Sequence, residues 1–268
     1  MFARALTPAA LAAAFALTLA PAASAQQFRY APGTAQYRMT VDAKVTQTMM
    51  GQNNQNEVTS GQKFTVALAR QAGDTLSMDV TIDSLAQMTP LGPMPGLDSL
   101  IGKKVHALLS SSGEVYSSRV DAADSATMLA SISSQLVHFL PAIHAALTDG
   151  ATWTDTVSTN SNQNGLNLKR TVISRYTVDG DTTVGGAQAH KLRRESTSTT
   201  SGSGTMQGQA VTMSGTSTGT GVAVVTSNGT FLGSTNTEDA KASVTLTDAG
   251  MTIDSQTNAQ TKVEKIGG

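Results

Sequence analysis

The chain contains no cysteine, and both charged and aromatic side chains are scarce. Without cysteine, disulfides and thiolate zinc sites are excluded, so stability has to come from core burial and backbone pairing. Charged residues make up 14% of the chain, below the roughly one quarter that is typical of globular proteins. Aromatic residues make up 4%, too few for the aromatic girdles of a membrane-spanning barrel.

The first residues predict a secretory signal peptide over residues 1–25. Arg4 is followed by an apolar run from Ala9 to Ala20, and Ala23-Ser24-Ala25 has the small-residue pattern of a cleavage site. The apolar run is shorter than the roughly 20 residues that a spanning helix needs, and no later run reaches that length. We therefore expect an exported protein, periplasmic or extracellular in a Gram-negative bacterium, with no transmembrane segment after cleavage and no cysteine for a lipid anchor.

Removal of this segment leaves a nearly neutral chain. The leader contains one of the 18 basic residues and none of the 19 acidic ones, so the mature net charge is 17 − 19 = −2. This balance gives no electrostatic footprint for nucleic acid. We expect no nucleic-acid partner, and the chain shows no cofactor-binding motif.

Residues 26–120 read as a first β-meander. From Tyr37 to Thr46, apolar and polar residues alternate, which is typical of a half-buried antiparallel strand. Two further strands follow. The segment from Gln87 to Gly102 then interrupts the pattern with three prolines and three glycines among apolar residues. It predicts either a loop that covers one end of the core or a mobile, methionine-rich flap over an apolar cavity.

Residues 121–149 predict the one long helix. Leucine and isoleucine recur at three- and four-residue spacing from Leu129 to Leu147, which places them on one helical face. Pro141 lies inside this segment and predicts a kink, or a break into two shorter helices, near Leu140.

Residues 150–268 read as a second β-meander. The segment from Ser196 to Thr237 has no charged residue and is rich in Ser, Thr and Gly. Such a composition is compatible with disorder. The near period-two spacing of its apolar residues favours strands instead.

These elements predict a single, mainly β domain (α+β) over residues 26–268. The first choice is a curved antiparallel sheet, an open or half barrel of about ten to twelve strands wrapped on a long helix over 121–149. The alternative is a two-sheet β-sandwich with the helix at one end.

The most distinctive short segments are Gly150-Ala-Thr-Trp153 and Tyr176-Thr-Val-Asp-Gly180. With the signal peptide and the two meanders around a helix, the layout resembles exported bacterial proteins with domains of unknown function. It is also similar in general form to the half-barrel carriers that move lipid or lipoprotein acyl chains across the periplasm. The resemblance implies a curved sheet that holds an apolar ligand, and it carries over no site residues.

No catalytic set emerges from the reactive residues. Gly215-Thr-Ser217-Thr-Gly219 matches the nucleophile-elbow pattern, but no helix and no histidine follow it. His138 and His144 are six residues apart and therefore fall on different sides of a helix. We predict that the protein is not an enzyme and that it has no metal site and no cofactor.

Two functions stay open at this stage. The first is binding of an apolar or lipid ligand between sheet and helix. The residues predicted to line that site are Met88, Leu91, Met94, Leu129, Ile132, Leu136 and Ile143. The second is a structural, assembly or protein-interaction module of the cell envelope with a fully packed core, whose strands between Thr197 and Thr235 could pair with a partner.

Overall fold

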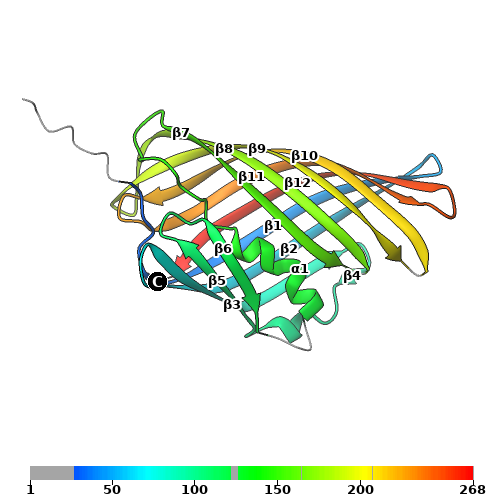
Figure 1. Ribbon diagram of the computed structural model, residues 1–268, viewed down its shortest axis with the longest axis horizontal. Helices are drawn as coiled ribbons and strands as arrows, with labels where there is room; N and C mark the ends of the chain where they lie inside the picture. The colour runs from blue at the N-terminus through cyan, green and yellow to red at the C-terminus, as the bar shows by residue number, and fades with distance from the viewer. Residues whose placement is uncertain (1–26, 122–125, 164, 207, 268) are drawn as a thin grey trace, which may run out of the picture.

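The computed structural model describes residues 27–121, 126–163, 165–206 and 208–267, and these form one strongly curled antiparallel sheet with a short helix (Figure 1). The predicted signal peptide lies outside the described residues. The sheet order is β6-β5-β3-β2-β1-β12-β11-β10-β9-β8-β7, with the two-residue β4 paired to β3. The strands are β1 (Gly33–Met49), β2 (Gln52–Arg70), β3 (Thr75–Thr89), β4 (Gly92–Pro93), β5 (Lys104–Ser110), β6 (Val115–Val120), β7 (Thr152–Gln163), β8 (Leu166–Val184), β9 (Ala187–Met206), β10 (Gln209–Thr226), β11 (Phe231–Leu246) and β12 (Met251–Gly267).

The up-and-down order gives the half-barrel two different ends. We call the end that carries the β1–β2, β3–β4, β7–β8, β9–β10 and β11–β12 turns the distal end, and the opposite end the proximal end. Period-two alternation decides which residues face inward. Tyr37 and Met39 of β1 are buried on the concave side, and Arg38 between them faces outward.

The prediction of a sheet wrapped on one long helix over 121–149 is wrong. Helix α1 spans only Ala126–Val137, and the chain from His138 to Ala151 is irregular. Pro141 accounts for the ending, because a proline inside a helix has no N–H to donate and its ring clashes with the carbonyl four residues earlier. That carbonyl belongs to Val137, the last helical residue. The alternative of a two-sheet sandwich is also wrong, since one continuous sheet contains all the described strands.

The irregular segment 138–151, which we call the strap, crosses the concave face at the proximal end. Tyr30 donates its hydroxyl hydrogen to the Pro141 carbonyl at 2.8 Å, and Trp153 donates its indole N–H to the Ala142 carbonyl at 2.8 Å. The backbone N–H of Ile143 donates to the Ser112 carbonyl at 2.9 Å. These bonds satisfy strap carbonyl and amide groups that a helix would have paired internally.

The apolar core fills the space between the proximal sheet and the α1–strap segment. Phe139 of the strap lies against three rings of the sheet, with centroid distances of 5.2 Å to Tyr37, 5.2 Å to Phe64 and 5.6 Å to Phe231. All three contacts are edge-to-face and lie within the distance range that aromatic pairs favour. Burial in this cluster raises the pKa of Tyr37 to about 12, because the phenolate would lose its hydration.

Glycines on the concave side allow the sheet to curl at β9 and β10. A Cβ built on Gly221 would lie 2.2 Å from the Asn236 side-chain oxygen and 2.5 Å from the Thr235 carbonyl oxygen. On Gly204 it would lie 2.0 Å from the Gly165 carbonyl oxygen. The neighbouring strands approach these positions too closely for any side chain, so the curl depends on glycine here.

The segment 196–237, apart from residue 207, forms β9, β10 and the start of β11, as the period-two spacing predicted. Among the described residues, none of the helical segments combines the length and the apolar character needed to cross a membrane.

We predict that Phe64→Ala lowers the free energy of unfolding by about 3–5 kcal/mol, the usual effect of removing a buried aromatic ring. Phe64 is fully buried beneath the strap. Urea unfolding followed by circular dichroism measures the change, with Ile173→Ala on the exposed outer face as the control. Equal effects of the two substitutions would contradict the position of the core.

Gly221→Ala should destabilise the protein by about 1–3 kcal/mol, because the added methyl group meets backbone of the neighbouring strand. The matched control is Gly61→Ala, where a Cβ would meet nothing within 4 Å. That change should be neutral or slightly stabilising, because alanine restricts the unfolded chain. Thermal unfolding of both variants tests the role of the concave glycines, and an undisturbed Gly221→Ala variant would contradict it.

Candidate functional site

The predicted site residues of the helix and strap lie inside the proximal core. Leu129, Leu136 and Ile143 are fully buried, and Ile132 is partly buried against the same core. They belong to one buried cluster with residues of the concave sheet and with Leu100, which lies in the 3₁₀ helix η1 (Leu97–Leu100). Their part in ligand binding stays a prediction, since the described structure shows them in contact with the protein's own side chains.

The three remaining predicted residues lie apart from that core. Met88, Leu91 and Met94 belong to the β3–β4 hairpin, where Met88 pairs with Pro93, and their exposed fractions are 50%, 100% and 40%. The apolar loop therefore divides in two, because Leu97 and Leu100 pack into the core while the hairpin tip is open to solvent. The structure does not bring the two predicted groups into one cavity.

A second apolar surface lies on the concave face at the distal end, and the sequence analysis missed it. Its members are cross-strand neighbours in one line, which we call the distal apolar row. The row consists of Met49, Ile253, Val244, Met213 and Leu168, with Gly202 between the last two. Each of these side chains points to the concave face, because it is an even number of residues away from a buried inward residue of the same strand. Ile253 is related in this way to Val263, and Leu168 to Tyr176.

The next line toward the distal rim is also apolar. Met251 pairs with Leu246, Leu246 with Val211, Val211 with Gly204 and Gly204 with Leu166. Val211 and Leu166 are buried, whereas Met49 at the other side of the row is 47% exposed. The apolar surface is therefore closed beside β8 to β10 and open beside β1.

A polar belt separates the distal apolar row from the core. Arg170 of β8 donates to the Glu238 carboxylate of β11 at 2.9 Å, across the concave side of β9 and β10. Three strand spacings in a flat sheet amount to roughly 14 Å, so the curl brings the two side chains within reach. Arg194 also faces inward and donates to the Ser174 hydroxyl at 3.1 Å. An apolar chain on the distal row would have charged and hydrogen-bonding groups beside it.

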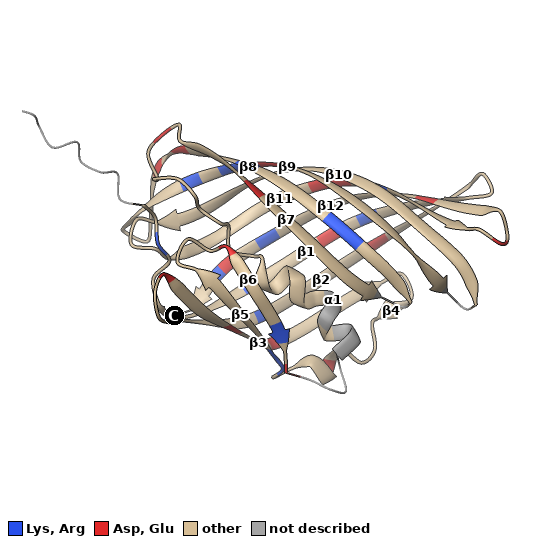
Figure 2. Cartoon of the chain, viewed as in Figure 1, with Lys and Arg blue, Asp and Glu red and all other residues tan. Residues whose placement is uncertain are grey.

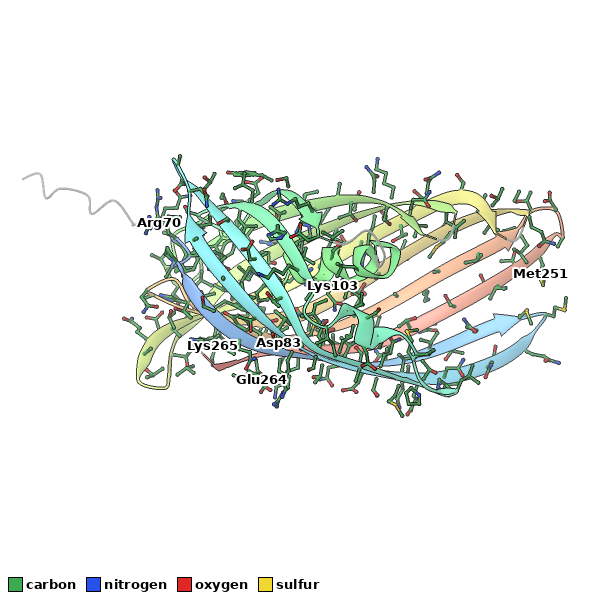
Figure 3. All side chains as sticks on the ribbon, turned by 90° about the horizontal axis from the view of Figure 1, so that it is seen from below. Arg70, Asp83, Lys103, Met251, Glu264 and Lys265 are labelled. Atoms are coloured by element: carbon green, nitrogen blue, oxygen red, sulfur yellow. The ribbon has the colours of Figure 1, made fainter. Side chains whose placement is uncertain are left out.

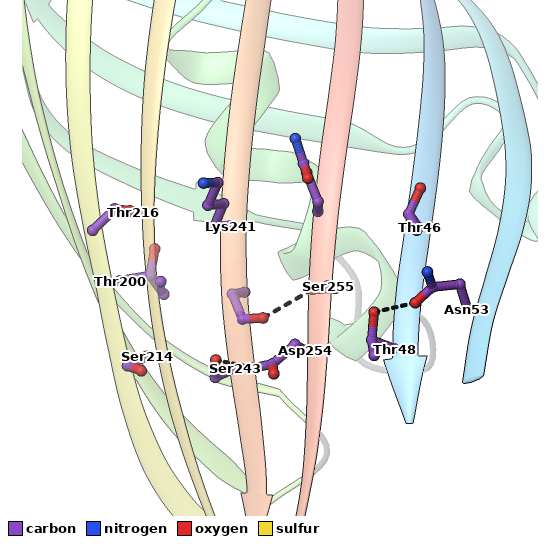
Figure 4. A pocket seen from close by; sticks show the side chains of 13 residues that line it. Thr46, Thr48, Asn53, Thr200, Ser214, Thr216, Lys241, Ser243, Asp254 and Ser255 are labelled. Atoms are coloured by element: carbon purple, nitrogen blue, oxygen red, sulfur yellow. Dashed lines mark hydrogen bonds between the residues drawn. The ribbon is translucent and has the colours of Figure 1, made fainter. Parts of the chain in front are cut away.

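A trough of about 570 Å³ lies on the opposite, outer face (Figure 4). Lys241, Thr216, Gln256 and Thr46 line it as cross-strand neighbours on β11, β10, β12 and β1. Several lining groups bond one another, since Thr48 donates to Asn53 at 2.7 Å and the Ser255 hydroxyl donates to the Ala242 carbonyl at 3.3 Å. The trough is polar, holds one cation and one anion (Asp254), and indicates no particular chemistry.

The nucleophile-elbow match does not have the geometry of that motif. Gly215 to Gly219 lie in the middle of β10, which continues as a strand on both sides. The Ser217 hydroxyl is buried and shares a hydrogen bond of 2.7 Å with Ser198 of β9. An elbow serine needs an exposed position on a strand-to-helix turn, and Ser217 has neither feature.

The four histidines lie in three environments, and His138 and His144 share the neighbourhood of Asp155. His106 is held on the outer face between Asp79 and Asp121, and His190 between Asp181 and Ser227. His144 Nε2 is 3.8 Å from the Asp155 carboxylate, while burial lowers the pKa of His138, with Asp155 opposing that shift. Within the described ranges, no group of three or more His, Asp or Glu side chains is placed to hold a metal ion.

Comparisons with known proteins show no matching family model and no matching curated protein. Among solved structures, the chain is similar to Neisserial surface protein A, with 8% identity, 87% of this chain and 99% of that chain covered, and a TM-score of 0.24. It is similar to OccK2 of Pseudomonas aeruginosa in complex with glucuronate, with 7% identity, coverage of 90% and 100%, and a TM-score of 0.31. It is also similar to a DUF1329 family protein of Desulfovibrio piger, with 10% identity, coverage of 82% and 83%, and a TM-score of 0.21. Likenesses of this size indicate no shared function.

The His106 cluster gives a pH prediction. Both ring nitrogens face carboxylates, which accept but do not donate, so the contacts at 2.6 Å to Asp79 and 2.5 Å to Asp121 favour the imidazolium. These hydrogen bonds raise the pKa of His106 above its ordinary value of 6.5. The contribution of the protonated His106 to the free energy of unfolding is therefore complete below pH 6.5. It is lost as the pH rises through the raised pKa of His106.

We expect the His106 ring resonances to titrate above 6.5 by NMR, and Asp79→Asn to move that titration downward. The control is Asp155→Asn, because Asp155 lies beside His144 and not beside His106. A titration of His106 that is unchanged in the Asp79→Asn variant would contradict the assignment.

Proposed function

We propose that this protein is an exported, non-catalytic carrier that holds an apolar or lipid chain on the distal part of its concave face. The observation that supports the proposal is the distal apolar row, which runs from Met49 to Leu168 across six strands. Met49 is 47% exposed and the other members of the row are partly exposed, and contiguous apolar surface that is open to solvent marks interaction sites. The binding site lies beyond the helix, rather than between helix and sheet.

The neighbouring polar belt suits an amphiphilic ligand. Arg170 lies one inward row and Glu238 three inward rows from Val244 and Met213, and their side chains remain about half exposed despite the ion pair. A ligand with an apolar chain and a polar group can place the chain on the row and the polar group at the belt. Pockets for small molecules commonly combine an apolar lining with a few polar groups that fix orientation.

The outer face of the sheet supports a location in an aqueous compartment. The outward residues of β12 are Asp254, Gln256, Asn258, Gln260 and Lys262, and most of them are exposed. Strands that face lipid carry an apolar outer band instead. Together with the predicted signal peptide, this surface favours an exported Gram-negative protein that works in the periplasm or outside the cell.

A structural or assembly role is the second candidate, and the tightly packed proximal core favours it. Its partner strand could not add to β9 or β10, because each of these strands is already paired on both sides. The edges available for strand addition are β6 and β7.

Native mass spectrometry with solvent extraction, on protein purified from its own exported compartment, tests the carrier function. We expect a reproducible additional mass that extracts as a lipid. An unliganded mass under gentle conditions would favour the assembly role.

The double substitution Met213→Gln and Val244→Gln should weaken binding of a pyrene-labelled fatty acid by about tenfold or more, because each buried apolar side chain contributes roughly 1.5–3 kcal/mol. The matched control is Thr212→Gln and Thr245→Gln, the adjacent cross-strand pair on the outer face. Equal binding by the two double variants would contradict a site on the distal apolar row.

A further inference from the structure

Two hairpin tips in the distal half expose large apolar side chains, and the β3–β4 tip is set back from the β1–β2 tip, because Met88 pairs with Thr59 of β2. The β1–β2 turn presents Met49 and Met50, which are 47% and 82% exposed, and the β3–β4 hairpin presents Leu91, which is 100% exposed. Met88 and Met94 flank Leu91 and are 50% and 40% exposed. Single exposed apolar residues are ordinary, but five on two tips of one end form a pattern.

The backbone at Met50 has the geometry of a tight hairpin turn. Met50 has φ of 50° and is the one non-glycine residue with positive φ among the described residues. The left-handed region costs a side chain with a Cβ roughly 1–2 kcal/mol relative to glycine. Met50 and Gly51 are the two central residues of the β1–β2 hairpin, and both have positive φ, as a type I′ turn requires. The tight turn therefore accounts for the backbone of Met50 and leaves its side chain 82% exposed at the tip.

The basic side chains are distributed unequally, because the distal turns hold no Lys or Arg, although Asp248 lies in the β11–β12 turn (Figure 2). The sequence contains no Lys or Arg in residues 45–62, 84–102, 156–168, 195–237 or 242–261, which include all five distal turns. Figure 3 shows the contrast, with Arg70 and Lys265 toward the proximal end and Met251 at a distal tip. The residues behind Met50 are amides, from Gln52 to Asn56.

We propose that the distal end docks on a neutral, zwitterionic lipid surface, with Met50 and Leu91 as its inserted side chains. Apolar tips can enter the boundary between headgroups and acyl chains, and the amides behind them can bond to headgroups. The absence of basic residues near the tips argues against an anionic surface, since attraction to anionic lipid depends on Lys and Arg. Docking in this orientation would place the open side of the distal apolar row next to the membrane.

The test is flotation of the exported protein with phosphatidylcholine vesicles, in parallel with vesicles that also contain phosphatidylglycerol. We expect similar binding to both. The double variant Met50→Asp and Leu91→Asp should bind at least about tenfold more weakly, because two apolar contacts are lost and two charges meet the interface. The control is Tyr116→Asp and Ile266→Asp, two exposed residues at the proximal end, which should bind like the unmodified protein.

Because the chain has no cysteine, a single introduced cysteine can carry a dye at one chosen position. An environment-sensitive dye on Met50→Cys should shift to the blue with vesicles, and the same dye on Tyr116→Cys should not. No flotation, flotation only with phosphatidylglycerol, or equal binding of the tip and control variants would overturn the proposal. Concentration-dependent self-association through the tips without lipid would overturn it in favour of a second copy.

These outcomes are independent of the carrier function. The tip substitutions leave Val244 and Met213 intact, so a co-purified lipid mass can persist when docking fails. Docking can likewise succeed in the Met213→Gln and Val244→Gln variant when ligand binding fails.

Discussion

The close approach of β9, β10 and β11 on their concave side is the constraint from which the shape of the molecule follows. Where Gly221 meets Asn236 and Gly204 meets Gly165, there is no room for a Cβ. Glycine at these inward positions lets the strands curl until side chains three strands apart can touch, as the Arg170–Glu238 pair does. A flatter sheet would separate the members of the polar belt and open the distal apolar surface into an exposed plane.

The curl produces more concave surface than one short helix can cover. Helix α1 and the strap fill only the proximal half, where Phe139 completes an aromatic cluster with Tyr37, Phe64 and Phe231. The strands continue well beyond that core at the distal end (Figure 1). The proximal end therefore contains the buried core that stabilises the fold. The distal end retains apolar residues that the chain itself does not bury completely.

The two functional proposals concern neighbouring parts of the distal end but depend on different residues. Ligand binding depends on inward side chains in the middle of strands, such as Val244 and Met213. Membrane docking depends on turn residues, such as Met50 and Leu91. Taken together, the two proposals place the distal apolar row beside a docked membrane. An apolar chain would then pass between the two without exposure to water, which is the main cost of moving apolar surface.

The sequence by itself determined the strands, because period-two alternation and turn residues are local signals, and it placed the break of the helix near Pro141. It did not determine how far the helix extends. The spacing from Leu129 to Leu147 fits a helical face, but Ile143 reaches the core from an irregular strap whose backbone is satisfied by Ser112, Tyr30 and Trp153. Only tertiary structure decided this, because those partners are remote in sequence. The same holds for the distal apolar row, which joins residues from Met49 to Ile253 through strand register and curl, neither of which any single segment encodes.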